Sequence, residues 1–361
     1  MIEYSFYGCL LSIVIWLYAY LRNKSQIQRN SSHGTSFFEL GIITILFSTF
    51  AYISGDFYSY QEIYNSVITV KDSRHLEDFY IWLINHLPEN YFLWRAIVWG
   101  AATYLLLSTF KRLRCNPQIS SLLFILISLV GTFYFLRNSL GYCMLYYGVA
   151  VLLCRKNLTS ALWGLLAIGI SYFLHKSMFL YIGIMVIAFI PLNKSLIKLS
   201  IILFPFIYST VFFISSSILS FSGLTEQSGD SGLNYLNSED ISYNSNILGY
   251  LKMFINRLPI YLLLIKAIKD IYFKKIKVEY RYLVFLQYSY FLTYLSLLFL
   301  GQEVSKFLSP RFWDASLLPL TIFLAHYLYI IPRTKYIRIC LYLLLFSIFY
   351  NFSYQIYSFF K

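Results

Sequence analysis

Lysine and arginine are concentrated in every second gap between the hydrophobic runs of this 361-residue chain. Nineteen of the 29 basic residues fall in six alternate gaps, whereas only three of the 16 acids, Glu39, Asp270 and Glu279, do so. Because cytoplasmic loops of membrane proteins carry an excess of Lys and Arg, this alternation predicts a chain that crosses a membrane repeatedly, with those gaps inside. The nineteen are Arg22, Lys24, Arg29, Lys111, Arg112, Arg114, Arg155, Lys156, Lys194, Lys198, Lys266, Lys269, Lys274, Lys275, Lys277, Arg281, Arg333, Lys335 and Arg338.

The composition supports a membrane protein and argues against several other classes. Hydrophobic residues make up 58% of the chain and charged residues only 12%, which is more apolar surface than a soluble domain of this length would bury. The net charge of +13 comes from short clusters rather than one basic stripe, so nucleic acid is not expected as a partner. The five cysteines show no CxxC or metal-ligand spacing, so we expect no disulfide framework, no metal site and no cofactor.

Twelve apolar segments approach the roughly 20 residues that a membrane-spanning helix needs. We therefore predict an all-α polytopic integral membrane protein with about 10–12 transmembrane helices, both termini outside, and one transmembrane domain over residues 1–361. The sixth and seventh segments are short and form either two spans or one helical hairpin. The segments are about 2–21, 37–54, 91–110, 118–136, 138–154, 158–174, 177–191, 196–220, 247–265, 281–301, 312–330 and 336–357.

Two longer segments, residues 55–90 and 221–246, are predicted to face outward. In the first, apolar residues recur every three or four positions between Leu76 and Leu87, which predicts a helix lying flat on the membrane surface. The second is rich in Ser, Gly and Asn, and we predict a partly mobile flap there.

The sequence contains none of the common nucleotide-binding or hydrolase motifs, so candidate chemistry rests on ionisable residues near the outer ends of helices. Arg257 is the deepest, about 15 Å into its predicted helix, and Pro259 predicts a break beside it. It either marks a binding site, or is a snorkelling side chain or a partner of Glu303. Arg137 lies in a short turn on the side where cations are rare. It either binds phosphate oxygens through bidentate bonds or simply marks the interface.

Two further candidates have equally ordinary explanations. His175 and Lys176 interrupt two apolar runs. Histidine is the usual proton carrier near neutral pH, although a lone histidine at a helix end is more often an interfacial residue. Arg311 and Asp314 are three residues apart at the start of a span, where a local salt bridge competes with a functional role.

Several short sequence words occur in an order that is similar to a known family. They are Asp56 with Tyr60 and Tyr64, Glu77 before an apolar helix, Phe-Leu-Arg-Asn-Ser-Leu-Gly at 135–141, Phe-Leu-His-Lys-Ser at 173–177 and Ser-Pro-Arg-Phe-Trp at 309–313. Together these resemble the EpsG family of bacterial polysaccharide polymerases, relatives in function of the Wzy polymerases of O-antigen and capsule. The likeness covers roughly residues 40–330. The family usually has a small residue such as Ala where this chain has Gly141.

The resemblance implies glycosyl transfer on the outer face of the bacterial inner (cytoplasmic) membrane. One glycan on undecaprenyl diphosphate would be the donor, and a second lipid-linked repeat unit the acceptor; membrane lipid and a chain-length regulator are further expected partners. The implied catalytic residues are His175 as base, Asp56 as the rival base, and Arg137, Arg257 and Arg311 as stabilisers of the departing diphosphate. The candidate substrate-binding residues are Tyr60, Tyr64, Arg95, Asn138 and Lys176.

Two other classes of function remain open. A lipid-linked oligosaccharide flippase or another secondary transporter would place charges near the membrane midplane and show a repeated architecture. This chain shows no repeat, and most of its outer charges sit at helix ends. Another membrane glycosyltransferase or acyltransferase has the same scaffold requirements as a polymerase, and the sequence separates these enzymes poorly.

Overall fold

The computed structural model describes residues 2–24, 35–50, 56–69, 77–129, 136–221, 247–299, 305–331 and 334–358. At residues 2–6, 56–59, 208–221, 247–255, 305–308, 351 and 354–358 this covers the backbone alone. Within these ranges the chain forms fourteen α-helices and two short π-helical segments, and no strand. It divides into two compact units: unit 1, formed by Met1–Met178 with Leu324–Lys361, and unit 2, formed by Phe179–Phe323. The expectation that they form one domain stays a prediction.

Each of the twelve predicted segments coincides with a helix, so the all-α prediction is confirmed. Unit 1 contains α1 (Ile2–Asn23), α3 (Phe37–Phe50), α4 (Asp56–Thr69), α5 (Asp78–His86), α6 (Tyr91–Arg112), α7 (Pro117–Leu123), η1 (Phe124–Ser128), α8 (Leu136–Leu153), α9 (Leu158–Leu174) and α16 (Lys335–Ser358). Unit 2 contains α10 (Met178–Ala188) from its second residue, α11 (Lys194–Phe221), α13 (Ile247–Ile268), η3 (Lys269–Phe273) and α14 (Tyr280–Leu298). Helix α15 (Ser305–Ile330) belongs to unit 2 up to Phe323 and to unit 1 from Leu324.

Among the described helices, α6 alone is both long enough and apolar enough to cross a membrane by itself. Four shorter apolar stretches accompany it, at 37–50, 117–128, 158–174 and 178–188. The number of crossings and their direction therefore stay predictions. Residues 222–246, all of the predicted flap except its first residue, lie outside the described part of the chain.

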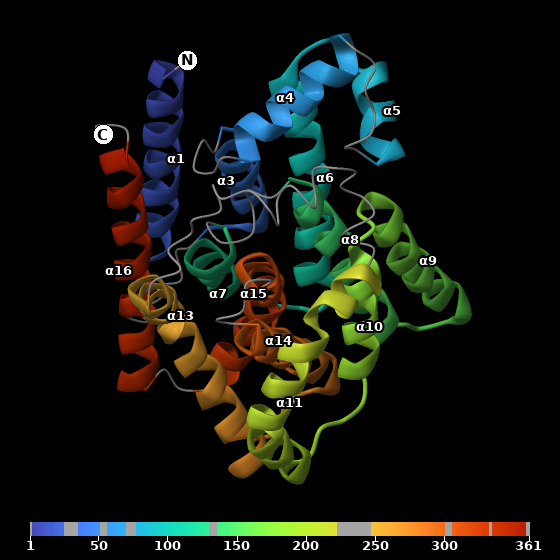
Figure 1. Ribbon diagram of the computed structural model, residues 1–361, viewed down its shortest axis with the longest axis vertical. Helices are drawn as coiled ribbons and strands as arrows, with labels where there is room; N and C mark the ends of the chain where they lie inside the picture. Colours follow the sequence, from blue (N-terminus) through green and yellow to red (C-terminus); the bar gives the residue numbers. More distant parts are fainter. Residues whose placement is uncertain are drawn as a thin grey trace. The chain divides into compact units, whose positions relative to one another are not determined.

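Unit 1 is a series of neighbouring helices. Helix α1 packs against α3 and α16, α3 against α6, α6 against α8, and α8 against α9. Figure 1 shows α1 and α16 side by side, with the start of α1 and the end of α16 at the same end of the pair. That arrangement agrees with two termini on one side of a membrane.

Trp16 joins three of these elements in the core of unit 1. Its side chain is fully buried, and its indole Nε1–H donates to the carbonyl oxygen of Ile125 at 3.1 Å. Ile125 lies in the π-helical segment η1, whose looser turn changes the usual backbone pairing. The indole also meets the rings of Phe349 and Phe352 edge to face. Buried tryptophan with a satisfied N–H is a strong packing contact, so Trp16 fixes α1 against η1 and α16.

The first outer loop is more helical than predicted. Residues 56–69 form α4, which the sequence did not predict, and the expected surface helix is present as α5. Its apolar side does not face lipid, however, because Tyr80, Leu83 and Ile84 are buried within the protein. The ring of Tyr80 meets that of Trp94 on α6. Protein packing therefore replaces the expected membrane contact of this helix.

The three acids that share the basic gaps are all neutralised by basic neighbours. Glu39 contacts Arg22 at 3.4 Å, and Glu279 contacts Arg281 at 2.7 Å. Buried Asp270 contacts Lys266 and also Lys274, the latter at 3.3 Å. Each acid in the described residues of the basic gaps therefore has a basic partner.

Cysteine labelling tests that sidedness directly. Single cysteines at Ser228 and Lys274, in a background without other cysteines, should differ in their reaction with a membrane-impermeant thiol reagent. Ser228 should be labelled on intact cells with a permeabilised outer membrane, and Lys274 should react only after lysis, because the basic gaps are predicted to face the cytoplasm. Labelling of Lys274 in preference to Ser228 would invert the topology.

Two tyrosine hydroxyls of α14 join that helix to other helices of unit 2. Tyr288 donates to the carbonyl of Tyr181 at 3.2 Å, and Tyr294 donates to the carbonyl of Ser200 at 2.7 Å. Helix α13 runs without interruption through Pro259, so the break that the proline predicts is absent. Neighbouring packing lets a helix tolerate a proline in its interior.

Candidate active site

Glu77 occupies the position where a side chain normally caps a helix, yet it does not cap α5. It precedes Asp78 with extended backbone angles, φ −69° and ψ 150°, and its carboxylate makes no hydrogen bond to the first turn. A capping side chain typically stabilises a helix by about 1 kcal/mol. The carboxylate is instead directed at two residues that are distant in the sequence.

Those two residues are Arg137 and His175. Oε2 of Glu77 accepts from Nη1 of Arg137 at 3.2 Å, and Oε1 lies 2.7 Å from Nδ1 of His175. Glu77 and His175 are 9% and 7% exposed, whereas the Arg137 side chain keeps 24% of its surface exposed. One buried carboxylate therefore links a permanent cation to a titratable ring in a site that is open on one side.

The environment keeps Glu77 ionised at neutral pH. Burial by itself would raise the pKa of Glu77, but the hydrogen bond to His175 and the charges of Arg137 and His175 lower this pKa to about 2. An ionised carboxylate accepts hydrogen bonds and donates none. Nδ1 of His175 therefore carries the proton that this contact needs, and Nε2 is the nitrogen that can accept a proton from a substrate.

Two tyrosines complete the surroundings of Arg137. The hydroxyl of Tyr60, on α4, accepts from Nε of Arg137 at 3.1 Å, and the guanidinium lies 5.6 Å from the Tyr60 ring centre. The hydroxyl of buried Tyr80, on α5, donates to the backbone carbonyl of Arg137 at 3.5 Å. We call Tyr60, Glu77, Tyr80, Arg137 and His175 the Glu77 cluster; it joins α4, α5, α8 and the end of α9.

A close crossing of α8 and α9 sets the distance between Arg137 and His175. A Cβ atom added at Gly148 would lie 2.7 Å from the carbonyl oxygen of Gly164, and one added at Gly164 would lie 2.9 Å from the carbonyl oxygen of Gly148. The two backbones therefore touch at this point. Arg137 lies near the first turn of α8, and His175 follows the last turn of α9. The crossing holds both residues level at one end of the hairpin.

Gly148→Ala should therefore separate α8 from α9 and disturb the Glu77 cluster. Because the clash is with backbone, we expect destabilisation by about 1–3 kcal/mol, measured by thermal unfolding in detergent. Gly169→Ala is the matched control on α9, since nothing lies within 4 Å of its added Cβ. Equal stability of the two variants would contradict the importance of the crossing.

The structure gives two predicted substrate-binding residues a packing role. Arg95 is 1% exposed and donates to the carbonyl oxygens of Ser48 at 2.7 Å and Thr49 at 3.1 Å. These carbonyls lie in the last turn of α3, where cationic donors stabilise a helix end. Tyr64 is buried between the rings of Tyr91 and Trp94. Their geometry favours structure over substrate binding.

The remaining candidates of unit 1 flank the Glu77 cluster in the sequence. Asn138, half-buried, follows Arg137, and Lys176, exposed, follows His175. Asp56 begins α4, but its side chain lies outside the described part of the chain. The structure therefore places Asn138 and Lys176 next to residues of the Glu77 cluster. It does not decide whether Asp56 or His175 is the base.

Arg257 forms a second cationic centre, within unit 2. It is 6% exposed, and its Nη1 donates to the hydroxyls of Ser296 at 3.0 Å and Ser309 at 3.3 Å. Its guanidinium lies 4.8 Å from the ring centre of Trp313. Arg257 thus contacts both ends of the Ser-Pro-Arg-Phe-Trp word, in which Arg311 is half-buried. Among the described residues, no carboxylate forms an ion pair with Arg257; Glu303, the acid that the sequence offered as its partner, lies outside the described part of the chain.

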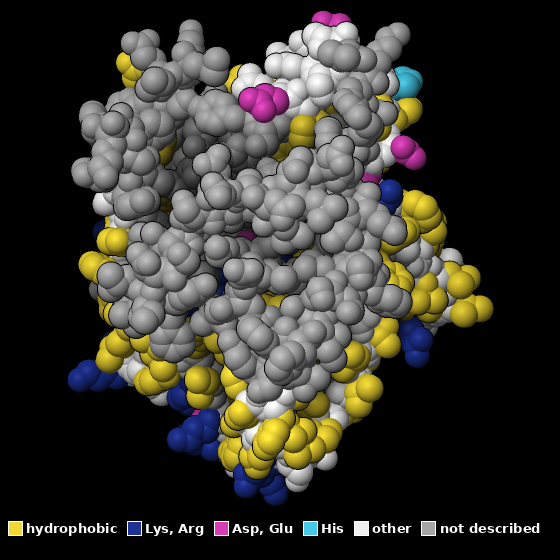
Figure 2. Space-filling view, viewed as in Figure 1, with side chains coloured by type: hydrophobic (Ala, Val, Ile, Leu, Met, Phe, Trp, Pro, Cys, Tyr) yellow, Lys and Arg dark blue, Asp and Glu magenta, His cyan; other side chains and the backbone are white. Residues whose placement is uncertain are grey.

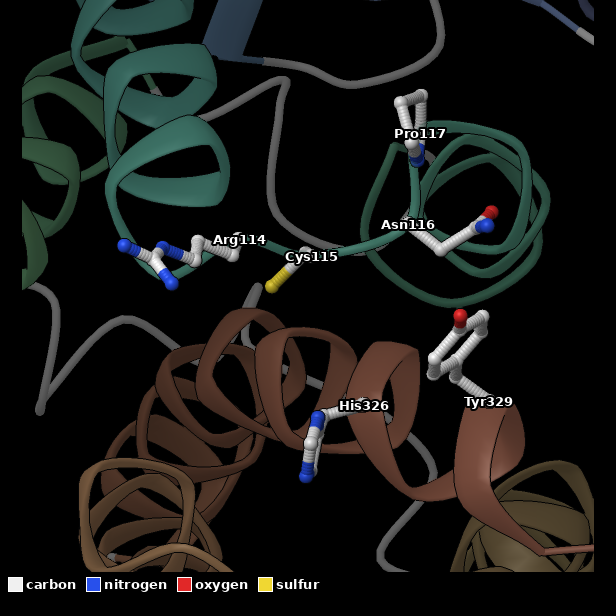
Figure 3. Close-up of a pocket in the computed structure, with 6 residues that line it drawn as sticks. All are labelled: Arg114, Cys115, Asn116, Pro117, His326 and Tyr329. Atoms are coloured by element: carbon white, nitrogen blue, oxygen red, sulfur yellow. The ribbon is translucent and has the colours of Figure 1, made fainter.

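Unit 1 also contains a cavity of about 270 Å³. It lies between the turn after α6 and the last part of α15 (Figure 3) and is lined by Arg114, Cys115, Asn116, Pro117, His326 and Tyr329. In Figure 3 the Tyr329 hydroxyl points toward Asn116, whereas the Arg114 side chain extends away from both. The cavity shares no residue with the Glu77 cluster and adjoins a basic gap.

Comparison with protein families matches residues 35–361 to the EpsG family, a family of polysaccharide polymerase-like membrane proteins. The chain belongs to the EpsG family. As a member of the EpsG family, it is a membrane protein of polysaccharide biosynthesis. A search among curated proteins gave no match, and a search among solved structures gave none.

The region matched to the EpsG family contains every short motif on which the resemblance was based. The structure shows that residues from several of these motifs contact one another. Tyr60, Arg137 and His175 were predicted site residues, and they meet in the Glu77 cluster. Glu77 and Tyr80 were not assigned to the site. An acid just before an apolar helix indicates a cap, and the missing capping bond becomes visible only in the structure. In the sequence, the feature that pointed to Glu77 was its place among the short motifs that resemble the EpsG family.

Proposed function

We propose that this EpsG family protein polymerises oligosaccharide repeat units carried on undecaprenyl diphosphate, at the outer face of the bacterial inner membrane. Family membership supports the class of reaction, and the Glu77 cluster supports its chemistry. The observation that carries the proposal is the pair of contacts from one ionised carboxylate to His175 and to Arg137. A carboxylate that orients a histidine through Nδ1 prepares Nε2 to act as a general base.

The reaction transfers one glycan from its lipid to a sugar hydroxyl. The acceptor hydroxyl gives its proton to Nε2 of His175, and its oxygen forms a bond to the anomeric carbon of the donor. The bond between that carbon and the diphosphate oxygen breaks, and undecaprenyl diphosphate leaves with the electron pair. Glu77 stabilises the imidazolium that forms. Nucleotide sugar is not needed, because the diphosphate of the lipid is the leaving group.

The two cationic centres suit different tasks. Arg137 already faces the Glu77 carboxylate, so the cluster of Glu77, Arg137 and a neutral His175 carries no net charge until the histidine takes up a proton. Arg257 contacts two hydroxyls and one indole face, and none of these three groups carries a negative charge. As the EpsG resemblance implies, we assign the departing diphosphate to Arg257 and to half-buried Arg311.

Arg137→Ala and Arg257→Ala should each lower the polymerisation rate by about 10²–10³-fold, because each removes one preorganised electrostatic donor. Lysine at either position should restore only part of the rate, since an ammonium group does not reproduce the planar fork of arginine. Quantitative polymer gels measure the effect, and Arg155→Ala, an exposed cation of a basic gap, is the control. Wild-type chain length in either Ala variant would remove that residue from the mechanism.

Reconstitution tests the function as a whole. Purified protein in lipid nanodiscs is incubated with undecaprenyl-diphosphate-linked repeat units, and the products are resolved as a ladder on a gel while released lipid diphosphate is counted. A polymerase releases one lipid diphosphate for each new linkage. In a parallel assay with the protein in sealed vesicles, transfer of label across the membrane without a ladder would establish a flippase instead. Consumption of an acyl or single-sugar donor would establish a different membrane transferase.

A further inference from the structure

The outward side of α5 carries a two-ring surface that no step of the reaction uses. Trp82 is 56% exposed, and its ring stacks on that of His86 with centroids 4.8 Å apart and planes at 29°. Nδ1 of His86 lies 2.8 Å from the carbonyl oxygen of Trp82, and this contact fixes the imidazole. Asp78 and Asn85 are also exposed and share this side of the helix, one turn to either side of Trp82.

The chemistry of this face does not fit lipid. An acyl environment disfavours a carboxylate, an amide and an imidazole placed around one indole. Helix α9 of the same unit shows what a lipid-facing side looks like, since its exposed residues are almost all apolar: Leu158, Leu162, Trp163, Leu165, Leu166 and Phe173. Trp82 and Trp163 are similarly exposed, but Trp82 lies one turn from only one exposed apolar residue, Phe79, and its other exposed neighbours are polar. The face around Trp82 is therefore built for water and for a ligand that is both apolar and hydroxylated.

A sugar has that combination. The C–H faces of a pyranose ring pack flat against an indole, while its hydroxyls donate to a neighbouring carboxylate or amide oxygen. The charge of this region indicates which class of sugar it can bind. Glu62, Asp78 and Glu89 are all exposed, and Figure 2 shows acidic, histidine and apolar side chains together over the α4–α5 end of unit 1. These carboxylates disfavour uronic acids and phosphorylated sugars, and they suit neutral or amino sugars.

The surface is continuous with the Glu77 cluster. Asp78 directly follows Glu77, and Tyr80, on the buried side of the same helix, holds the backbone of Arg137. At 1.5 Å per residue, the nine residues of α5 extend about 13 Å from that cluster. We propose that the outward face of α5, formed by Asp78, Trp82, Asn85 and His86, binds the glycan of the substrate and selects neutral or amino sugars. This inference rests on the proposed function for the reaction that follows binding.

Direct binding tests the surface without relying on catalysis. Full-length protein in nanodiscs is applied to an array of neutral, amino and uronic-acid oligosaccharides. Wild type and Trp163→Ala should bind members of the neutral or amino sets, and Trp82→Ala should bind them about tenfold more weakly. Absence of binding by the wild type, equal binding by Trp82→Ala, or preference for the uronic acids would each overturn the proposal.

Brominated lipids provide a second, independent readout. Bromine in the acyl chains quenches tryptophans that contact lipid, so Trp163→Phe should remove much more of the quenched fluorescence than Trp82→Phe. Equal loss in the two variants would place Trp82 in the membrane and overturn the glycan surface.

Kinetics separate this inference from the proposed function. With lipid-linked repeat units as substrate, Trp82→Ala should raise KM about tenfold and leave kcat within about twofold of wild type. A wild-type protein that binds glycans but forms no polymer would remove the proposed function and leave the surface in place. Polymerisation by Trp82→Ala with unchanged KM would remove the glycan surface and leave the proposed function in place.

Discussion

Replacement of Glu77 by glutamine is expected to lower the polymerisation rate by about 10⁴-fold, the scale of the comparable change in a carboxylate–histidine pair. The amide keeps the shape of the side chain, but its NH₂ group donates to Nδ1 and so favours the wrong tautomer of His175. The charge that stabilises the imidazolium is lost in the same change. Initial rates of lipid diphosphate release by the purified variant measure the effect.

The loss should come from chemistry and not from folding. Glu279→Gln is the matched control, because Glu279 is an exposed acid in a basic gap and belongs neither to the Glu77 cluster nor to the glycan surface. It should polymerise at the wild-type rate. Glu77→Asp keeps the charge and shortens the reach, so an intermediate rate is expected. A Glu77→Gln variant with normal rate and normal yield of inserted protein would show that the carboxylate has only a structural role.

Removal of the imidazole in His175→Ala should lower polymerisation by about 10²–10⁴-fold while substrate still binds. Single lipid-linked repeat units should then accumulate on the outer face of the membrane, because flipping does not depend on this histidine. An external lectin or glycosidase detects them in cells with a permeabilised outer membrane. Short polymers should disappear in parallel.

The other outcomes of the His175 experiment are equally informative. Normal polymer in His175→Ala would leave Asp56 as the base, although the contact between Glu77 and His175 would then need another purpose. Repeat units trapped in the cytoplasmic leaflet would identify a flippase and contradict the polymerase. The location of the accumulated units therefore decides between two classes of function.

The helices of this protein follow from its sequence because each long apolar run has to bury its backbone polar groups within a helix. All twelve predicted segments are helical for that reason. Helix α4 was missed, since residues 56–69 are polar and its aromatic positions find their partners in distant segments: Tyr60 in Arg137, and Tyr64 in Tyr91 and Trp94. Tertiary contacts and not local pattern stabilise that helix.

Part of the candidate site was predictable from the sequence. Whether a residue could be predicted depended on whether its partners are local or distant in the chain. Arg137 and His175 interrupt apolar runs, so their type and place already indicate chemistry. Arg95 has the same appearance in the sequence, but the carbonyls that bind it belong to α3 and cannot be identified before the helices are packed. Glu77 shows the opposite error: its local pattern indicates a structural cap, whereas its partners in the candidate site lie 60 and 98 residues away.

The crossing of Gly148 and Gly164 has a consequence for how sequences of this kind can change over time. Eleven residues separate Gly148 from Arg137, and eleven separate Gly164 from His175, so both arms of the hairpin measure about 16 Å from the crossing. The turn at residues 154–157 lies on the far side of the crossing and has no part in that measurement. Residues can be inserted or lost in the turn while the two arms stay in register. One residue added within either arm rotates its side chain by about 100° around the helix and removes it from the shared carboxylate.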